Sequence, residues 1–462
     1  MNTRLSTRTT ILIIADLAII YGGILIGLYL RLGVEGAAEQ LVDNNGWAKT
    51  ALVTVVCLIS IYIFDLYDYA VVNSRRELVL RLVQALGISW AILAILFYFV
   101  PSLLVGRGAA FFSIFVTLVL LLSFRLSIHY FLGHPDLGEK ILIIGDRQVI
   151  IDTAQATLSR RDAGHRIVGY LANDPEAAIV SAPLLRDLGR IEDLEEVVEK
   201  EKIDRIVLGV RERRGTFPAE SLLKLRLAGN VSIEESTSFF ERVTGKVHLD
   251  NLRPSWLIFS FRPRDTRLST FVRESLYRGI ALVGLLISLP IALVTALLIK
   301  LETEGPFLYK QERVGKNGVS FTLYKFRSMH QDAEANGEPV WATDDDERAT
   351  KVGKIIRKIR VDEIPQFWNI IKGEMSFIGP RPERPHFVSH LAADIPFYEY
   401  RHLVAPGLTG WAQINYPYGA SIEDARQKLQ YDLYYIKNQS FALDVIIMFE
   451  TVKTVIFGRG AR

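Results

Sequence analysis

Four long runs of apolar residues lie near the start of the chain, at residues 9–30, 50–66, 82–105 and 109–129. About 20 apolar residues of helix cross the hydrocarbon core of a bilayer, and a spanning segment must satisfy its backbone polar groups internally. We therefore predict four transmembrane helices. The first run lacks the small-residue exit of a cleaved signal peptide, so we predict that it is retained.

The basic residues around these runs predict the orientation. They gather at the N-terminus, in the second loop and after the fourth run, whereas the third loop carries a single arginine. Because basic loops stay on the cytoplasmic side, we expect the N-terminus and everything after the fourth run to be cytoplasmic. The residues concerned are Arg4, Arg8, Arg75, Arg76, Arg81, Arg125 and Lys140.

Composition narrows the classes that remain. With 54 Lys+Arg and 51 Asp+Glu among 462 residues, the formal net charge is +3, so bulk electrostatics gives no support for nucleic-acid binding. The single cysteine, Cys57, excludes an internal disulfide framework and a Cys-rich zinc site. At roughly 100–200 residues per domain, the length predicts two to four domains.

A fifth apolar run, residues 279–299, contains no charged residue. Pro290 stands near its centre, and proline removes a helical hydrogen bond and clashes with the preceding turn. Basic residues flank both ends, which conflicts with a simple crossing. We predict a membrane hairpin over residues 279–300, broken at Ser288 and Pro290. The alternative, a kinked fifth transmembrane helix, would place the rest of the chain on the other side of the membrane.

The middle of the chain has the pattern of a parallel α/β domain. Residues 139–146, 167–171 and 205–210 indicate buried strands, and residues 191–202 indicate a helix between two of them. A dinucleotide fingerprint needs three glycines so that a pyrophosphate can approach the backbone, and only Gly145 is present. We therefore predict a degenerate Rossmann-like module with a structural or regulatory role, and not a NAD site.

Charged residues crowd into the C-terminal third. Lys325 and Arg327 lie two apart on a predicted strand, so they share a face and are candidates for binding a diphosphate. Asp362 and Glu363 precede Pro365, which is tolerated only in a first helical turn, so both carboxylates are expected at a helix N-terminus. Paired carboxylates can hold Mg²⁺, and one of them can attack phosphorus. A solvated strand face and N-capping remain the plainer readings of these motifs taken singly.

Two further basic features of the C-terminal third are suited to binding phosphate groups. Arg381 stands between Pro380 and Pro382, which fix the loop around a guanidinium suited to two-point contact with phosphate. Residues 348–360 hold six basic residues, ending at Arg360, and no acidic one, with apolar residues at helical spacing. That pattern predicts a basic amphipathic helix at an anionic lipid surface.

In this order the motifs resemble the bacterial sugar transferases, which move a phosphosugar from a nucleotide onto polyprenyl phosphate. The resemblance covers about residues 270–462, and the front end and middle module resemble the large form of the family. The end of the chain, at residues 431–436 and 457–462, resembles a subgroup associated with exopolysaccharide export. The matching stretches are Lys325-Phe326-Arg327-Ser328-Met329, Arg360-Val361-Asp362-Glu363-Ile364-Pro365-Gln366, Gly379-Pro380-Arg381-Pro382 and Pro406-Gly407-Leu408-Thr409-Gly410-Trp411-Ala412-Gln413.

The resemblance implies a chain of three parts. These are a membrane α-helical bundle of four helices over residues 1–134, an α/β Rossmann-like domain over residues 135–265, and an α+β catalytic domain over residues 266–462 with a re-entrant membrane helix. It also implies a multi-pass protein of the bacterial inner membrane whose catalytic domain lies on the cytoplasmic face.

The resemblance further implies a two-step reaction. Asp362 attacks the phosphorus nearer the sugar of a UDP-sugar, UMP leaves, and undecaprenyl phosphate then takes the phosphosugar from the aspartate. Asp362 and Glu363 are the expected Mg²⁺ ligands. The expected partners are the donor, the acceptor, the lipid bilayer and a second copy of the chain as a homodimer, but no nucleic acid. The expected phosphate contacts are Lys325, Arg327, Arg360 and Arg381.

Three other classes of protein fit the sequence less well. A nucleotide-sugar epimerase or dehydratase usually carries a Tyr-x-x-x-Lys pair, and none of the 18 tyrosines has lysine four residues on. A conventional glycosyltransferase would use the three aspartates at residues 344–346 as its metal motif, but no apolar strand precedes them. A non-catalytic membrane scaffold would not need Asp362, Glu363 and Arg381 together.

Overall fold

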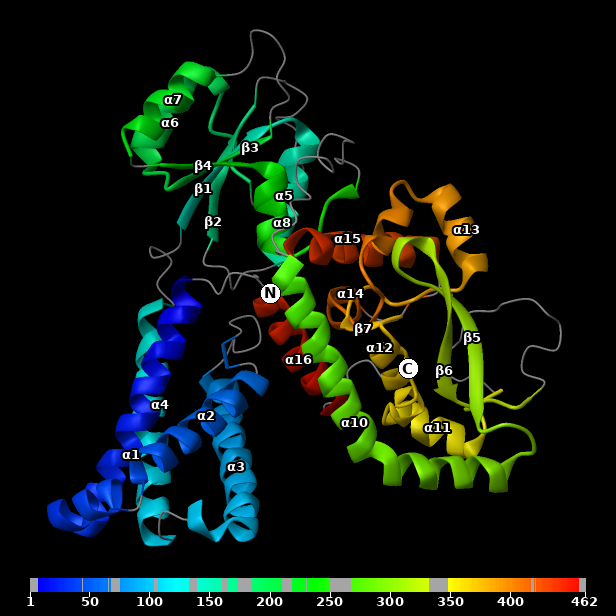
Figure 1. Ribbon diagram of the computed structural model, residues 1–462. Helices are drawn as coiled ribbons and strands as arrows, with labels where there is room; N and C mark the ends of the chain where they lie inside the picture. The colour runs from blue at the N-terminus through cyan, green and yellow to red at the C-terminus, as the bar shows by residue number, and fades with distance from the viewer. Residues whose placement is uncertain are drawn as a thin grey trace. The chain divides into compact units, whose positions relative to one another are not determined.

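A computed structural model shows two compact units, Met1–Thr244 and Gly245–Arg462, which are described separately (Figure 1). The predicted domain boundaries after residues 134 and 265 fall at or beside residues that the structure does not describe, so they stay predictions. The aspartates at 344–346 also lie outside the described residues. The described residues are 7–43, 45–64, 66–67, 75–103, 107–132, 139–159, 165–172, 185–209, 218–229, 231–249, 267–331, 348–416, 419 and 421–456.

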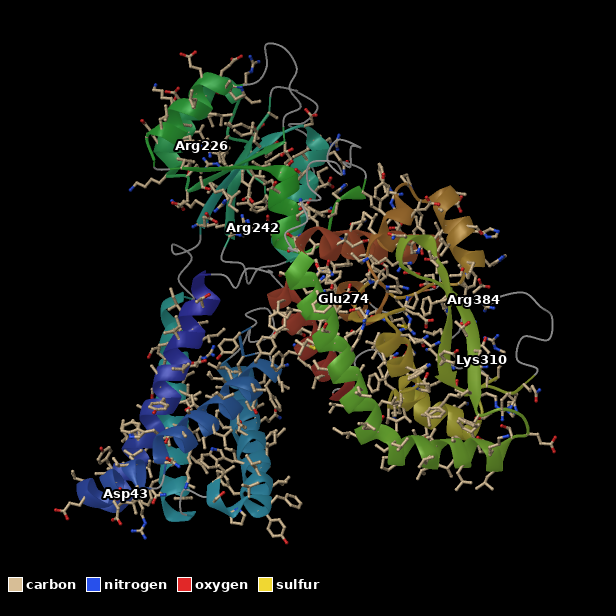
Figure 2. The ribbon with its side chains drawn as sticks, in the orientation of Figure 1. Asp43, Arg226, Arg242, Glu274, Lys310 and Arg384 are labelled. Atoms are coloured by element: carbon tan, nitrogen blue, oxygen red, sulfur yellow. The ribbon has the colours of Figure 1, made fainter. Side chains whose placement is uncertain are left out.

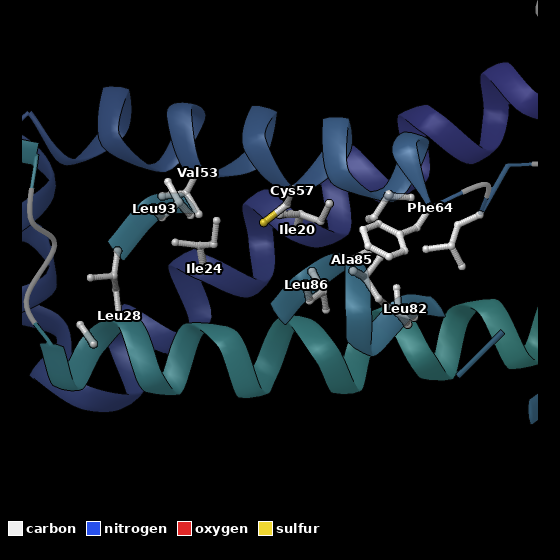
Figure 3. Close-up of a cluster of buried hydrophobic side chains, with 14 of the residues drawn as sticks. Ile20, Ile24, Leu28, Val53, Cys57, Phe64, Leu82, Ala85, Leu86 and Leu93 are labelled. Carbon is white, nitrogen blue, oxygen red and sulfur yellow. The ribbon is translucent and has the colours of Figure 1, made fainter. Parts of the chain in front are cut away.

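Four apolar helices begin the first unit, as predicted, and each is long and apolar enough to cross a membrane. Ile20, Ile24 and Cys57 lie in their shared buried core, which Figure 3 shows in close-up. Gly27 allows the first and fourth helices to touch, because a Cβ at this position would overlap the backbone of Ser113. The helices are α1 (Thr7–Val42), α2 (Gly46–Ile63), α3 (Arg75–Phe99) and α4 (Arg107–Leu132).

A buried ion pair crosses this bundle. Arg125 of α4 pairs with Asp16 of α1, donates to the carbonyl of Leu66 at 2.8 Å, and lies over the Tyr67 ring at 5.0 Å. Both charged side chains are buried. A charge at membrane depth is costly unless it is paired, so this contact holds the two helices in one register.

A parallel four-stranded sheet follows, in the order β2-β1-β3-β4, which confirms the predicted α/β pattern (Figure 1). Alternate residues of β1 are buried on opposite faces of the sheet, so helices cover both sides. Ile141 and Ile143 pack toward α5 and α8, whereas Leu142 and Ile144 pack toward α6 and α7. The elements are β1 (Glu139–Gly145), α5 (Arg147–Ser159), β2 (His165–Leu171), α6 (Leu194–Glu201), β3 (Arg205–Gly209), α7 (Ala219–Leu227), β4 (Ser232–Glu235) and α8 (Ser236–Thr244).

The carboxyl ends of β1 and β3 meet where dinucleotide-binding domains receive a pyrophosphate. Here the Val149 side chain, from the first turn of α5, fills the space beside Gly145 and Gly209. A Cβ added at Gly145 would lie 3.2 Å from Val149 Cγ1 and 3.3 Å from the backbone of Gly209. The close packing of helix against strand is kept, but a valine side chain occupies the space next to the glycines.

The second unit combines a long apolar helix with two small sheets and a set of short helices. Strands β5 and β6 form an antiparallel hairpin, and β7 and β8 pair in parallel. The elements are α10 (Arg267–Glu302), β5 (Leu308–Val314), β6 (Ser320–Phe326), α11 (Lys351–Lys358), the 3₁₀ turn η7 (Val361–Glu363), α12 (Gln366–Lys372), β7 (Ser376–Ile378), α13 (Pro385–Asp394), the 3₁₀ helix η8 (Tyr398–Leu403), β8 (Gly407–Thr409), α14 (Trp411–Asn415), α15 (Ile422–Asn438) and α16 (Phe441–Ile456).

Helix α10 contains the run for which a break was predicted. The chain instead stays helical through Ser288 and Pro290, and the helix bends along its length (Figure 1). Ser288 Oγ donates to the Leu285 carbonyl at 3.1 Å, and such a bond beside a proline accompanies a bend without ending the helix. Only 11% of the most apolar window of α10 is buried, so most of its apolar surface is left for lipid.

A fully buried carboxylate ties α10 to the end of the chain. Asp444 of α16 accepts hydrogen bonds from Tyr277 of α10 at 2.7 Å and from Tyr435 of α15 at 2.9 Å. The Tyr435 hydroxyl also lies 3.4 Å from the carbonyl of Ile378 in β7. Asp444 and Tyr435 together therefore link the long apolar helix to the strand that leads into the Arg381 loop.

Replacing Asp444 with alanine should destabilise the protein, because two buried tyrosine hydroxyls lose their acceptor. We expect Asp444→Ala to lower the free energy of unfolding by about 2–4 kcal/mol, and Asp444→Asn by less, since one acceptor oxygen remains. Denaturant titration in detergent micelles measures both. The exposed Asp394→Ala is the matched control, and equal effects of all three variants would contradict the anchoring role.

Candidate active site

The two predicted carboxylates lie in the 3₁₀ turn η7 and are almost fully buried, with exposures of 7% for Asp362 and 8% for Glu363. Arg360, just before the turn, adopts a left-handed backbone with φ 59°. The helix itself begins only at Gln366, after Pro365, so the prediction that both carboxylates open a helix is wrong by one turn. The tight turn brings both carboxylates to Lys325 of β6, at 3.9 Å for Asp362 and 3.2 Å for Glu363.

Three cations converge on one oxygen of Glu363. Its Oε1 lies 3.2 Å from Lys325 Nζ, 3.4 Å from Arg360 Nη1 and 3.3 Å from Arg381 Nη2. Asp362 is held more loosely, since its Oδ2 is 3.9 Å from Lys325 Nζ, while its buried Oδ1 has no hydrogen-bond partner among the described residues. The structure thus brings five of the predicted site residues into one cluster.

Lys325 is placed by the contact between β6 and α12. Asn369 of α12 is fully buried. Its side-chain Nδ2 donates to the Thr322 carbonyl at 2.7 Å, and its side-chain Oδ1 accepts from the Tyr324 backbone N–H at 3.2 Å. These bonds fix α12 to the backbone of β6 at the residue before Lys325. Asn369 was missed from the sequence because nothing in the local pattern distinguishes it from a surface amide.

The Arg381 loop is clamped on both sides. Arg313 of β5 donates to the Pro382 carbonyl at 2.9 Å, and the Gly407 backbone donates to the Pro380 carbonyl at 2.9 Å. A Cβ at Gly379 would lie only 2.9 Å from the nitrogen of Gly407, so two glycines let the backbones meet. Two stretches that are 27 residues apart in sequence therefore form one support for Arg381.

Arg401 and Asp432 form a second support that the sequence analysis missed. Arg401 Nη2 donates to the backbone carbonyl of Arg381 at 3.1 Å and lies 2.9 Å from Asp432 Oδ2. Both side chains are buried, and burial raises the pKa of Asp432 to about 6 although the Arg401 charge opposes the shift. No local signal links two residues from separate helices, so only the folded chain reveals the pair.

Arg327, Ser288 and Pro290 lie outside the carboxylate cluster. The Arg327 guanidinium donates to the carbonyls of Thr303 and Glu304, at 2.9 and 2.6 Å, and so fixes the chain just after α10. Lys325 and Arg327 were expected to contact the same diphosphate, but Lys325 faces Glu363 whereas Arg327 is held by the carbonyls just after α10. Ser288 and Pro290 belong to the middle of α10.

Burial and charge push the two carboxylates in opposite directions. Burial disfavours the Glu363 anion, but the charges of Lys325, Arg381 and Arg360 together hold the pKa of Glu363 well below its usual range. Burial raises the pKa of Asp362, with Lys325 opposing it and the Glu363 charge adding to it. Burial also lowers the pKa of Lys325. Neighbouring acids with separated pKa values can take different roles. Here Glu363 stays ionised as a fixed negative charge, and Asp362 is the more basic of the two carboxylates.

The cluster can be tested for its fit to a divalent metal. Among the described residues no group of three or more His, Cys, Asp or Glu side chains is placed to hold an ion by itself. Mg²⁺, however, is usually held by one or two carboxylates together with substrate phosphates and water. The unpartnered Asp362 Oδ1 is an available hard oxygen ligand, so the residues fit a metal that arrives with a phosphorylated substrate.

Comparison with known proteins assigns the part of the chain that contains this cluster to a family. A family model described as bacterial sugar transferase matches residues 268–458, which include all of it, and a model described as CoA-binding domain matches residues 62–211. A UDP-glucose:undecaprenyl-phosphate glucose-1-phosphate transferase of Caulobacter vibrioides is 36% identical over 217 residues, or 46% of this chain and 80% of its own. The chain belongs to the bacterial sugar transferase family.

Two relatives extend the match beyond the C-terminal part. A UDP-N-acetylgalactosamine-undecaprenyl-phosphate N-acetylgalactosaminephosphotransferase of Aeromonas hydrophila is 42% identical over 261 residues, which is 56% of this chain and 61% of that protein. A UDP-glucose:undecaprenyl-phosphate glucose-1-phosphate transferase of Xanthomonas campestris pv. campestris is 28% identical over 355 residues, 73% and 72% of the two chains. The chain thus spans under two thirds of the Aeromonas protein.

Replacing one member of the Arg401–Asp432 pair should destabilise the protein more than replacing both. Arg401→Leu leaves a buried, unpaired carboxylate and should lower the free energy of unfolding by about 3–5 kcal/mol. The double variant Arg401→Leu/Asp432→Leu should be more stable than either single variant, because no lone charge remains. Denaturant titration of the four proteins completes the cycle, and strictly additive losses would show that the two residues do not interact.

Proposed function

We propose that this protein transfers a sugar 1-phosphate from a UDP-sugar to undecaprenyl phosphate and releases UMP. The observation that carries the proposal is the buried carboxylate pair, in which Glu363 is held by three cations while one oxygen of Asp362 has no partner among the described residues. One carboxylate is thereby a structural charge and the other is free to react. The names of the relatives, which are sugar-phosphate transferases acting on undecaprenyl phosphate, support the same substrates.

In the first step, Asp362 acts as the nucleophile. One of its carboxylate oxygens attacks the phosphorus next to the sugar, a new Asp362 oxygen–phosphorus bond forms, and the bond to the bridging oxygen of UMP breaks with its electron pair. Burial supports this role because it leaves the carboxylate poorly solvated and more basic than an exposed aspartate. The product is a phosphosugar joined covalently to the enzyme.

In the second step, the phosphate oxygen of undecaprenyl phosphate attacks the same phosphorus, and the bond to Asp362 breaks. The aspartate is regenerated, and the lipid now carries the sugar on a diphosphate. Splitting the transfer lets a soluble donor and a lipid acceptor use one site in turn. By its resemblance to the family, we propose that this reaction initiates synthesis of an exopolysaccharide or another surface glycan. The homodimer stays a prediction.

The cations around Glu363 have a second task in this proposal. Lys325, Arg360 and Arg381 already face one anionic oxygen, so they are placed to contact the phosphates of the donor and to offset charge as the diphosphate is cleaved. Asp362 and Glu363 would hold Mg²⁺ together with those phosphates. When bound, the ion supplies Lewis-acid stabilisation of the phosphoryl oxygens.

The proposed site lies beside surfaces suited to a membrane. Ile355 of helix α11 and Ile359, just after it, are exposed next to basic side chains. Ile356, on the other side of α11, packs in one cluster with Ile299 near the end of α10. Glu302, the last residue of α10, accepts from the first backbone amides of α11, at 2.7 Å from Lys351 and 3.0 Å from Val352. We propose that α10 is re-entrant, bending near Pro290, and that the catalytic part stays cytoplasmic.

Labelling of a single cysteine tests this topology. Cys57 is the only cysteine, so Cys57→Ser gives a clean background in which exposed Lys310 of β5 is replaced, Lys310→Cys. A re-entrant α10 predicts that a membrane-impermeant maleimide labels the variant only after the cells are permeabilised. Labelling in intact spheroplasts would show that α10 crosses the membrane and would reject the cytoplasmic site.

Release of UMP tests the reaction class. Full-length protein in detergent, with undecaprenyl phosphate and Mg²⁺, should release UMP from at least one member of a panel of UDP-sugars. Asp362→Asn should reduce this rate by at least about 10³-fold, since the amide cannot form the phosphosugar ester. The active donor would identify the sugar.

Matched controls separate chemistry from folding. Asp394→Asn, at an exposed aspartate of α13, should keep wild-type activity, and Asp362→Asn should keep the wild-type unfolding midpoint. Chelation of Mg²⁺ with EDTA should abolish turnover and its restoration should recover it. Release of UDP in place of UMP would contradict the proposal, because it indicates ordinary glycosyl transfer.

A further inference from the structure

A cavity of about 250 Å³ lies in the second unit and is separate from the carboxylate cluster. It is walled by the first turns of α10, the last residues of α12, β7 and the end of α15. Ile370 and Gly373 line it at the C-terminal end of α12, whereas Asp362 and Glu363 precede the N-terminal end of that helix. Among the described residues, none of the predicted phosphate contacts lines this cavity.

The cavity concentrates positive charge from segments that are far apart in the sequence. Arg273 and Arg278 come from α10, Lys316 from the turn between β5 and β6, and Lys437 from the end of α15. Glu274 is the one carboxylate among the described lining residues, and it lies 3.9 Å from Arg278. Four cations facing one anion leave an excess of positive charge, which a phosphate group in the cavity would offset.

The same turns of α10 present an apolar surface on their other side. Phe271 is 67% exposed, Val272 55% and Leu276 45%, and they alternate with the cavity-lining Arg273 and Glu274. The helix runs from there into its long apolar stretch. Whether α10 crosses or re-enters, this first part lies where hydrocarbon meets water, so the cavity opens at the depth of lipid phosphates.

The wall next to the cations is rigid. Tyr277 lines the cavity and is 3% exposed, and its hydroxyl is fixed by the hydrogen bond of 2.7 Å to Asp444. A ligand held here therefore contacts the residue that joins α10 to α16. Binding would secure the first part of α10 against the domain that carries the carboxylates.

We propose that this cavity binds the phosphate of an anionic phospholipid and so anchors the start of α10 at the membrane surface. The inference rests on one part of the proposed function, the placement of α10 in the membrane. It does not depend on the transfer reaction, so a test that reads lipid binding without any donor can fail or succeed independently of UMP release.

The test uses the full chain in nanodiscs of phosphatidylcholine with increasing phosphatidylglycerol, followed by native mass spectrometry of the lipids that the protein retains. Removing one cation at a membrane surface weakens binding by about fivefold. Arg273→Gln/Arg278→Gln should therefore lower the apparent affinity for phosphatidylglycerol by at least about tenfold. Lys310→Gln, at an exposed lysine of β5 outside the cavity, is the matched control and should have no effect (Figure 2).

Glu274→Gln supplies a variant with the opposite sign. Removing the one carboxylate of the lining should strengthen phosphatidylglycerol binding, by up to about fivefold, a result that misfolding cannot produce. Equal retention by the wild type, the double variant and Glu274→Gln would overturn the proposal. Inorganic phosphate bound by the wild type without preferential retention of phosphatidylglycerol over phosphatidylcholine would also overturn it, because the ligand would then be a soluble anion.

Discussion

Everything in the proposed site depends on how the Glu363 charge is satisfied. A carboxylate buried to this degree is unstable alone, and here Lys325, Arg360 and Arg381 surround a single oxygen at 3.2–3.4 Å. The three cations come from a strand, a tight turn and a proline-bounded loop, so the ion cluster joins three segments. Because Glu363 takes these contacts, one oxygen of the neighbouring Asp362 has no hydrogen-bond partner in the part of the chain that the structure describes.

The supports behind the cluster explain why so much of the domain is needed to form it. Asn369 fixes α12 against β6, Arg401 and Asp432 hold the Arg381 carbonyl, and close glycine contacts join the strands β7 and β8. Asp444 connects this scaffold to the apolar helix α10. The proposed site, which would serve a soluble donor and a lipid acceptor, is thus built on elements that are attached to the apolar helix α10.

Local patterns predicted much of this architecture. The apolar runs, the alternating strands at residues 139–146 and 205–210, and the Asp362–Glu363 motif each depend on neighbours in sequence. Contacts between distant segments escaped prediction. Arg327 was expected beside Lys325, but its guanidinium binds carbonyls just after α10, a segment that is distant in sequence. Arg401 and Asp432 carried no signal, since their pairing depends on how η8 packs against α15.

The most direct test of the central claim is to look for the covalent phosphosugar on Asp362. Full-length protein is incubated with the active UDP-sugar and Mg²⁺ but no acceptor, quenched in acid, digested and analysed by mass spectrometry. The account predicts that the peptide containing Asp362 gains the mass of one sugar phosphate, that undecaprenyl phosphate removes it, and that Asp362→Asn never acquires it. Turnover with UMP release but without an adduct, or an adduct on another residue, would contradict the account.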